Sequence, residues 1–468
     1  MHQPTTGLGR KASIMRVKIL ILLGLLNFTW VASPLAGPVA DDAYLAKFHP
    51  VQAPESSGLI LKAGDRLAIC GDSITEQKMY SRIIEDYLTM CAPQLNISVR
   101  QYGWSGEKAD GFLSRMTNDC LRFDPTVATT CYGMNDCEYR AYDERIGQTY
   151  DTNMTAVVDA FKAHGVKVIL GSPGCISKVP FWANPAAVTL DDLDLNLCQL
   201  RNIDVKIARE ENVRFADVFW PMLTAGHIGR QEYGANYGIP GNDGVHPHWA
   251  GHLIMAYAFL TAMGLDGDIG TFTIDLKRNK IKVSEGHRVI SAKDGRYEIE
   301  SFRYPFCPCG PDGQAAASYP VCGRDDVNSD NSLESGMTLV PFNQRLNRLM
   351  LVVKGTDAKR YKITWGDDSE IFTAEQLNRG INLAQEFPAN PFSGAFSRVD
   401  MAIAAKQAYE TFEIKSFFRG ANSGNSMEAV VAQTDKVVGE AEKQRDGLVA
   451  AIRAAYAPVT HVIEINAE

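Results

Sequence analysis

The chain carries, after the apolar run Leu67-Ala68-Ile69, the stretch Cys70-Gly71-Asp72-Ser73-Ile74-Thr75-Glu76, and a segment with the pattern of a helix follows from Lys78 to Met90. A strand, a tight turn with Gly and Ser, and then a helix are typical of how an α/β protein presents a nucleophile. Ser73 would lie at the carboxyl end of the strand, where a helix N-terminus stabilises developing negative charge. Because many surface turns read Gly-Asp-Ser, the stretch indicates catalysis only if a base, an acid and oxyanion donors follow elsewhere.

From residue 65 to residue 264, short apolar runs alternate with amphipathic stretches. The expected strands are Arg66–Cys70, Ile97–Tyr102, Thr126–Tyr132, Lys167–Gly171 and Val213–Val218. The expected helices are Lys78–Met90, Ala109–Leu121, Asp143–His164, Leu190–Glu211 and His248–Met263. Strands rich in Val and Ile that alternate with helices predict a parallel sheet covered on both faces. Ligands bind outside the carboxyl ends of such strands, so residues with useful chemistry should follow them.

After Gly264 the pattern changes to short strands separated by turns. These strands are expected at Phe272–Val283, Arg288–Ser291, Tyr297–Arg303, Leu349–Lys354 and Tyr361–Thr364. The stretch Pro305–Ser335 is rich in loop-forming residues, and the chain has a helical pattern again from Thr373 onward. The sequence therefore predicts a β-rich segment and a helical C-terminal region behind the parallel sheet.

Composition and the N-terminus bound the functions that the chain can have. The formal net charge is -8, and without a long basic run this argues against nucleic acid as a partner. Arg16 and Lys18 precede the apolar run Ile19–Leu26, and small residues follow, which is the pattern of a secretory signal. A membrane anchor is the alternative, but the run is short for a span of about 20 residues. We expect a secreted or periplasmic protein without stable membrane insertion, and no lipid-anchored one because no cysteine lies near the cleavage zone.

Ten cysteines permit disulfides in an exported chain. The most favourable local bridge lies within Cys307-Pro308-Cys309 and Cys322, in a stretch with few core-forming residues. Zinc binding by these thiols is the alternative, but it lacks a fourth ligand nearby. His246, His248 and His252 are a second candidate for a metal site, although His246 is better explained as a base. The sequence predicts no metal and no cofactor.

Four blocks of residues follow the predicted strands or precede the last helix. They are Gly71-Asp72-Ser73, Tyr102-Gly103-Trp104-Ser105-Gly106, Gly133-Met134-Asn135-Asp136 and Asn242-Asp243-Gly244-Val245-His246-Pro247. Ser73 needs a base because a hydroxyl is a poor nucleophile at neutral pH. His246 can take its proton, and Asp243 can orient the imidazole. The side chain of Asn135 and the backbone N–H groups of Gly106 and Ser73 can bind the oxyanion of acyl transfer.

In these blocks the sequence resembles the SGNH or GDSL-type serine esterases and lipases over residues 65–265. The four diagnostic residues of that family correspond to Ser73, Gly106, Asn135 and His246, with Asp243 as the acid of the triad. The resemblance implies a three-layer α/β/α fold of flavodoxin-like type. It also implies hydrolysis of a carboxylic ester without a metal.

The residue patterns and the resemblance together suggest a division of the chain, and the resemblance suggests a class of substrate. The expected parts are a signal peptide at 1–40, an SGNH hydrolase domain at 41–265, a β-rich accessory segment at 266–370 and a helical region at 371–468. The version Gly71-Asp72-Ser73-Ile74-Thr75 is common among members that act on acylated carbohydrates, so a small or polymeric acetylated saccharide is the expected substrate. A lysophospholipase or short-chain lipase, and a non-catalytic glycan-binding protein on the same scaffold, are the alternatives. Trp104 either stacks on a sugar ring or packs as a wall of the core.

Overall fold

The computed structural model describes residues 43–308, 327–418 and 427–468, without the side chains of residues 418–434. The predicted signal segment, together with Cys309 and Cys322, lies outside the described residues. The chain divides into two compact units, Met1–Ala46 and Lys47–Glu468. Only residues 43–46 of the first unit are described, and every sheet and α-helix in the described residues belongs to the second.

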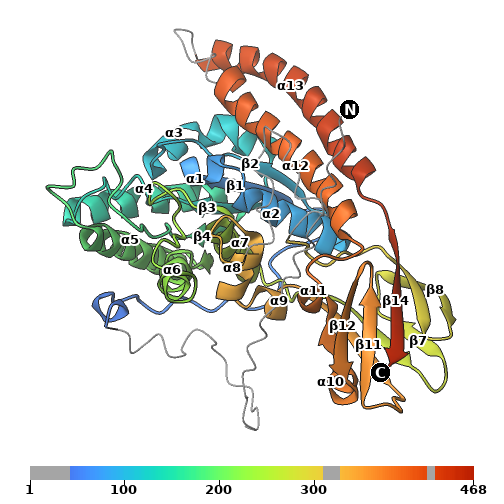
Figure 1. Ribbon diagram of the computed structural model, residues 1–468. Helices are drawn as coiled ribbons and strands as arrows, with labels where there is room; N and C mark the ends of the chain where they lie inside the picture. The colour runs from blue at the N-terminus through green and yellow to red at the C-terminus, as the bar shows by residue number, and fades with distance from the viewer. Residues whose placement is uncertain (1–42, 309–326, 419–426) are drawn as a thin grey trace, which may run out of the picture. The chain divides into compact units, whose positions relative to one another are not determined.

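The first part of this second unit is built on a five-stranded parallel sheet (Figure 1). Its strands are β1 (Arg66–Gly71), β2 (Ser98–Gln101), β3 (Val127–Cys131), β4 (Lys167–Gly171) and β5 (Arg214–Ala216). They lie in the order β2-β1-β3-β4-β5, and every neighbouring pair is parallel. Every residue of β3 is buried, as expected for a strand covered on both faces. The predicted flavodoxin-like sheet is confirmed, and its strand order reverses between β1 and β3, where such sheets bind ligands.

Helices cover the sheet in two groups. Helices α3 (Ala109–Asp119), α4 (Glu144–Ala163) and α5 (Leu190–Glu210) pack side by side, whereas α2 (Tyr80–Asp86) packs against α7 (Trp249–Ala262). A capping box between Thr189 and Asp192 starts α5. The segment expected as one helix from Lys78 to Met90 begins at Tyr80, because Lys78 takes a left-handed φ of 57° after the short helix α1 (Ser73–Glu76). It is also divided at Tyr87, where α2 is followed by a π-helical turn (Tyr87–Cys91). The pattern also does not predict α6 (Phe219–Tyr233).

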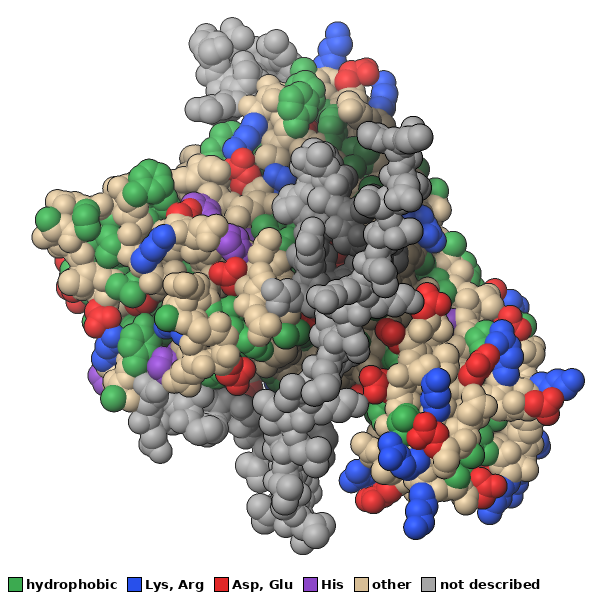
Figure 2. Space-filling model, in the orientation of Figure 1, with side chains coloured by type: hydrophobic (Ala, Val, Ile, Leu, Met, Phe, Trp, Pro, Cys, Tyr) green, Lys and Arg blue, Asp and Glu red, His purple; other side chains and the backbone are tan. Residues whose placement is uncertain are grey.

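Two further sheets form the β-rich part (Figure 1). One has the order β13-β10-β6-β7, with strands β6 (Asp268–Asp275), β7 (Lys280–Val283), β10 (Arg348–Lys354) and β13 (Ile381–Asn382). The other has the order β12-β11-β14-β9-β8, with strands β8 (His287–Lys293), β9 (Arg296–Ser301), β11 (Arg360–Trp365), β12 (Asp368–Thr373) and β14 (Val459–Ala467). The segment expected as one strand from Phe272 to Val283 is the hairpin β6–β7, because the chain turns at residues 276–279. Figure 2 shows Lys, Arg, Asp and Glu side chains of both signs covering this β-rich part at the lower right.

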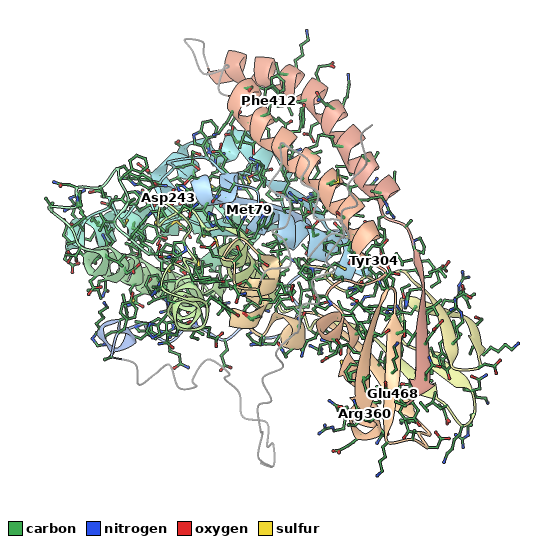
Figure 3. The ribbon with its side chains drawn as sticks, viewed as in Figure 1. Met79, Asp243, Tyr304, Arg360, Phe412 and Glu468 are labelled. Atoms are coloured by element: carbon green, nitrogen blue, oxygen red, sulfur yellow. The ribbon has the colours of Figure 1, made fainter. Side chains whose placement is uncertain are left out.

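The last strand of the chain lies in the middle of the second of these sheets. Strand β14 pairs antiparallel with β9 on one side and with β11 on the other. Figure 3 shows Arg360 and Glu468 next to each other in this part, and the Glu468 N–H donates to the Arg360 carbonyl at 3.0 Å. His461 of β14 is buried between the sheets, accepts a hydrogen bond from the Trp365 indole at 3.0 Å and faces Phe272 of β6.

Short helices lie between or directly after the strands of the β-rich part, and a pair of long helices covers the edge of the parallel sheet. The short ones are α8 (Leu333–Leu339), α9 (Phe342–Arg345), α10 (Ala374–Arg379) and α11 (Leu383–Glu386), of which α8 packs on α7. Helix α12 (Ser393–Glu413) lies along α2 and β2 and packs against α13 (Met427–Ala455) (Figure 1).

Buried charges hold α12 and α13 on the edge strand β2, and we call them the β2 ionic cluster. Its members are Glu85, Arg100, Lys406, Glu410, Glu413 and Arg445. Lys406 lies 2.8 Å from Glu410 and 3.0 Å from Glu85, and its ammonium donates to the Val99 carbonyl at 2.7 Å. The cluster therefore satisfies backbone groups of an edge strand that would otherwise be left without partners.

None of the helices in the described residues has both the length and the apolar character that a bilayer-spanning helix requires.

Candidate active site

Ser73 stands at the junction between β1 and α1. Asp72 is the N-cap of this helix, and its carboxylate accepts a hydrogen bond from the Ile74 N–H at 2.9 Å. Burial raises the pKa of Asp72 to about 7, although the hydrogen bond from Ile74 opposes this shift. Asp72 therefore fixes the turn, whereas the half-buried Ser73 presents its hydroxyl at the carboxyl edge of the sheet.

The structure brings His246 and Asp243 to Ser73 across 173 residues of sequence. The Nε2 atom of His246 lies 2.8 Å from the Ser73 Oγ atom, and its Nδ1 atom lies 2.6 Å from Oδ2 of Asp243. The Asp243 Oδ1 atom accepts from the backbone N–H groups of Val245 and His246, both at 2.9 Å. Burial alone would raise the pKa of Asp243, but these hydrogen bonds outweigh it, so the pKa lies below its usual value. Asp243 is therefore an ionised carboxylate near neutral pH, positioned against the imidazole.

The loop after β2 is pressed against α1. A side chain at Gly103 would meet the Glu76 backbone nitrogen at 2.2 Å, so only glycine permits this approach. The Trp104 N–H donates to the Gly71 carbonyl at 3.0 Å, which connects the loop to the end of β1. Gly106 follows with a φ of 75° and with no atom within 4 Å of the position that a side chain would take. The space beside Gly106 is therefore open, and its positive φ is the reason for a glycine at this position.

Asn135 follows β3 and lies beside the same loop. Its Nδ2 atom donates to the Glu107 carbonyl at 3.0 Å, and its Oδ1 atom accepts from the Tyr139 hydroxyl at 3.4 Å. Asp136 connects the end of β3 to the start of α3, because its carboxylate accepts from the N–H groups of Ala109 and Gly133 at 3.1 and 3.0 Å. Burial raises the pKa of Asp136 to about 6. An amide nitrogen carries two N–H groups, so Asn135 retains a second donor beyond its bond to Glu107.

The comparisons with known proteins agree with this geometry. Residues 69–254 match the model of the GDSL-like Lipase/Acylhydrolase family. These residues form a GDSL-like lipase/acylhydrolase domain. The chain is 25% identical to an acetylxylan esterase of Geobacillus stearothermophilus over 223 residues, which are 44% of this chain and 96% of that protein. The matched residues are therefore a hydrolase domain that acts on ester bonds.

A solved structure shares the fold over a longer part of the chain. It is a gut microbial diltiazem-metabolizing enzyme, with a TM-score of 0.67 and 21% identity, and the match covers 88% of this chain and 100% of that one. At this identity the likeness concerns the fold alone. The architecture that combines the GDSL-like domain with β-rich sheets and C-terminal helices therefore has a solved counterpart.

Trp104 is half-buried in the GDSL-like domain, with cations on its ring. The Arg115 guanidinium lies 5.2 Å and the Lys415 ammonium 5.3 Å from its centroid. The same Lys415, which lies 339 residues from Glu76, forms an ion pair with the Glu76 carboxylate. The other oxygen of Glu76 accepts from the Ser105 N–H at 2.5 Å. The loop after β2 is thus held by a cation from the turn after α12, and the sequence does not predict this contact.

Glu107, whose carbonyl accepts the hydrogen bond from Asn135, is itself held in place. Arg115 donates to the Glu107 carboxylate through Nε at 2.6 Å and to the Tyr102 carbonyl at 2.7 Å. The Tyr132 hydroxyl donates to the same carboxylate at 3.0 Å. Burial raises the pKa of Glu107, against the opposing effect of Arg115. The ion pair between Arg115 and Glu107 therefore fixes the backbone of Glu107, which follows Gly106 and accepts the hydrogen bond from Asn135.

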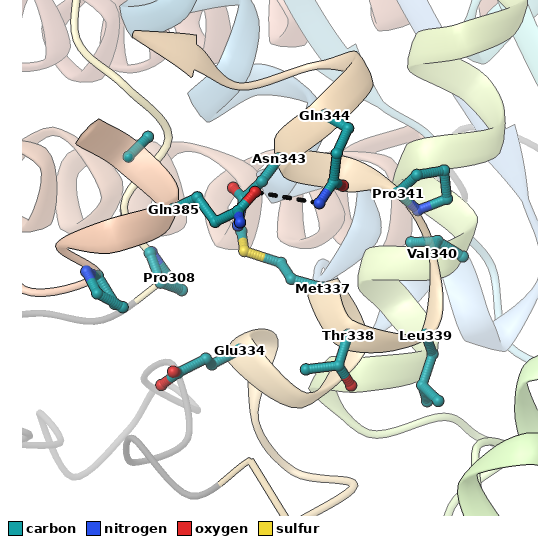
Figure 4. A pocket seen from close by; sticks show the side chains of 12 residues that line it. Pro308, Glu334, Met337, Thr338, Leu339, Val340, Pro341, Asn343, Gln344 and Gln385 are labelled. Atoms are coloured by element: carbon teal, nitrogen blue, oxygen red, sulfur yellow. Dashed lines mark hydrogen bonds between the residues drawn. The ribbon is translucent and has the colours of Figure 1, made fainter. Parts of the chain in front are cut away.

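A metal site at the histidines and a pocket elsewhere in the chain are the alternatives to this site. In the described part of the chain, no group of three or more His, Cys, Asp or Glu side chains is arranged to hold a metal. His252 is buried, and its Nδ1 atom accepts from the Tyr80 N–H at 3.2 Å. A pocket beside α8, α9 and α11, lined by Met337, Asn343 and Gln385 among others, contains none of the predicted site residues (Figure 4).

Proposed function

We propose that the chain is a serine esterase that works through an acyl-enzyme, with Ser73 as nucleophile, His246 as base and acid, and Asp243 as the residue that orients His246. The hydrogen-bonded series from Ser73 Oγ through His246 to Asp243, at 2.8 and 2.6 Å, is the observation that carries the proposal. This series has the geometry that nucleophile activation requires.

In the proposed first half-reaction, the Ser73 Oγ atom attacks the ester carbonyl carbon while its proton passes to Nε2 of His246. The oxyanion accepts hydrogen bonds from the backbone N–H groups of Ser73 and Gly106 and from the second N–H of Asn135. The bond between the carbonyl carbon and the alcohol oxygen then breaks, and His246 gives its proton to the leaving alcohol. The products are a free alcohol and an acyl-Ser73 ester.

In the second half-reaction, His246 takes a proton from water as the water oxygen attacks the acyl-enzyme. The resulting tetrahedral intermediate breaks its bond to Ser73 Oγ, and the proton on His246 returns to that oxygen. The carboxylic acid leaves and Ser73 is restored. Asp243 stabilises the imidazolium in both halves without taking a proton.

We propose an acetylated carbohydrate as the substrate. The acetylxylan esterase among the relatives supports this choice, as does the Gly71-Asp72-Ser73-Ile74-Thr75 form of the first block. The basic and apolar segments before residue 40 support export to the place where such polymers are found. Amino-terminal sequencing of the protein recovered from the medium or periplasm tests export, and an intact Met15 there would contradict cleavage.

The mechanism is tested by hydrolysis of p-nitrophenyl acetate with the wild type and Ser73→Ala. We expect kcat to fall by on the order of 10³-fold or more, because the nucleophile is removed. A fluorophosphonate probe should label the wild type at Ser73 and leave the variant unlabelled. Equal activity of the two proteins would contradict Ser73 as the nucleophile. Absence of labelling in the wild type would favour a glycan-binding protein on an esterase scaffold.

A second measurement tests the class of substrate. Products released from acetylated glycans, phospholipids and simple esters are identified by mass spectrometry. We expect acetate from the glycans. Release of fatty acid from phospholipids in preference to acetate would instead support a lysophospholipase.

A further inference from the structure

Three aromatic side chains cluster beside His246, and one of them, Trp182, contacts its ring. The rings of Trp182 and His246 have centroids 6.0 Å apart. Trp182 also contacts Phe181 at 4.8 Å and Tyr139 at 5.7 Å, with planes 82° and 90° apart. We call Tyr139, Phe181 and Trp182 the aromatic platform. Its flat faces stand at right angles, so they form a corner and not a stack.

Two members of the platform are exposed although they are apolar, whereas Tyr139 is half-buried. Phe181 is 89% exposed and Trp182 is 40% exposed, whereas most aromatic side chains of this domain are buried. Leaving a phenylalanine side chain in water forgoes the free energy that its burial would gain. Clustered apolar side chains beside polar catalytic groups are typical of a ligand site.

The loop that carries Phe181 and Trp182 is seated firmly on the loop that carries the acid and base. The Ser177 N–H donates to the Gly244 carbonyl at 3.0 Å. A side chain at Gly244 would meet Lys178 atoms at 2.6 and 2.7 Å, and its φ of 85° also favours glycine. The Ile176 N–H donates to the buried Asp194 carboxylate at 2.8 Å. The platform is therefore fixed relative to His246 before any ligand arrives, which reduces the entropy that binding costs.

We propose that the aromatic platform binds the ring of the alcohol part of the ester, namely the sugar ring next to the acetylated oxygen. This inference rests on the proposed function. His246 must give its proton to the alcohol oxygen, so the alcohol lies on the His246 side of the ester carbon. Trp182 packs on that imidazole, and its exposed neighbour Phe181 offers a second face at a right angle.

The chemistry of the two partners fits. A pyranose ring presents C–H groups on its faces and hydroxyl groups at its edge. The C–H faces pack on the electron-rich faces of aromatic rings, and the hydroxyl groups remain in water. Tyr139 joins the platform to the oxyanion side, because its hydroxyl donates to Asn135 Oδ1 at 3.4 Å. A sugar held in this corner would keep its ester carbon at Ser73.

The experiment compares two esters with the same acyl group, an acetylated methyl xyloside and ethyl acetate. The measured quantity is the ratio of their kcat/KM values, so a general effect on His246 cancels. We expect Trp182→Ala to lower this ratio by roughly tenfold and Phe181→Ala by several-fold, while Trp182→Phe retains most of it. Phe302→Ala removes an aromatic side chain of 42% exposure from the end of β9 and should leave the ratio as in the wild type.

Three results would decide against the platform. A ratio unchanged in both alanine variants would overturn it, and so would an equal decrease in the Phe302 control. Phenyl acetate provides a third arm, because a selective loss on this ester without a loss on the xyloside would indicate an aryl alcohol in place of a sugar. Failure of the proposed function looks different, since Ser73→Ala would then remain active on all three esters.

Discussion

Titratable side chains have opposite surroundings in the β2 ionic cluster and at the candidate active site. In the β2 ionic cluster, Lys406 is 1% exposed and Glu410 is fully buried. At the site, His246 and Asp243 are 29% and 30% exposed. Charges that are sealed from water need partners on every side, and their loss is costly to the fold. Charges that must meet a substrate keep one side open, and their loss is costly to the reaction.

The sharpest test of this contrast replaces the carboxylate at the site by an amide. Asp243→Asn should lower kcat by on the order of 10³–10⁴-fold, because an amide can present its NH₂ to His246 and favour the wrong tautomer. The free energy of unfolding should change little, since the side chain is partly in water. The measurement is ester hydrolysis together with urea unfolding.

Asp330 offers the matched control for Asp243. Its Oδ1 atom lies 3.1 Å from Nδ1 of His248, so it forms a second aspartate–histidine pair next to the site. Asp330→Asn should leave kcat close to the wild-type value. If both variants lost activity equally, the role given to Asp243 would be wrong.

The same chemical change in the ionic cluster should destabilise the fold. Glu410 accepts from Lys406 at 2.8 Å and from Arg445 at 2.8 Å, so Glu410→Gln removes the carboxylate that these two cations share and leaves Lys406 with Glu85 alone. We expect a loss of about 3–5 kcal/mol in the free energy of unfolding, measured by urea denaturation. Glu440→Gln changes a carboxylate that is 70% exposed on α13 and should have almost no effect. An equally small effect of Glu410→Gln would show that the cluster is not needed for packing.

Buried histidines extend the contrast to pH. Burial lowers the pKa of His252 and of His461 to about 3, in the GDSL-like domain and in the β-rich part respectively. The unfolded chain has a histidine pKa of about 6.5, so as the pH falls it binds protons before the folded chain does. Each buried neutral histidine therefore makes its full contribution to the free energy of unfolding above about pH 6.5. This contribution decreases below that pH, by about 2 kcal/mol per histidine between about pH 7 and pH 5.

Urea unfolding at the two pH values measures this decrease. His252→Gln should reduce it by the share of one histidine, because glutamine does not titrate. A decrease of the same size in the variant and in the wild type would exclude His252 as a source.

The smallest expected effect concerns the ion pair between Lys415, which follows α12, and Glu76, which lies in α1 beside the candidate active site. Lys415→Met removes the cation that holds Glu76, whose other oxygen accepts from the Ser105 N–H. Because Ser105 precedes Gly106, we expect kcat to fall by roughly tenfold with KM nearly unchanged, as for a loss felt in the transition state. Lys415→Arg should retain most activity. Lys443→Met, which changes a lysine of 72% exposure, is the control, and an equal loss there would contradict the contact.

The parallel sheet could be predicted because its residues carry local signals. The apolar run before Gly71 and the cap at Thr189 define the start or end of an element within a few residues of sequence. The site block at Ser73, Asn135 and His246 could be found because residues after parallel strands meet at one edge.

Other features depend on contacts that a single sequence does not record. Lys415 and Glu76 are 339 residues apart, and nothing near either of them indicates the other. The pattern of α13 predicts a helix without saying what covers it. Strand β14 does carry an alternating signal, since His461, Ile463 and Ile465 are its buried residues, but it follows directly on a long helix. The position of β14 between β9 and β11 is set by packing with segments far away in the sequence.

That position has a consequence for synthesis of the chain. During translation β9 and β11 are both made before β14, so each waits with an open edge until the nine residues of β14, Val459–Ala467, emerge. A chain truncated before Val459 would keep the whole GDSL-like domain and yet expose two unpaired strand edges. Loss of β14 would therefore be expected to cause association of nascent chains rather than loss of chemistry.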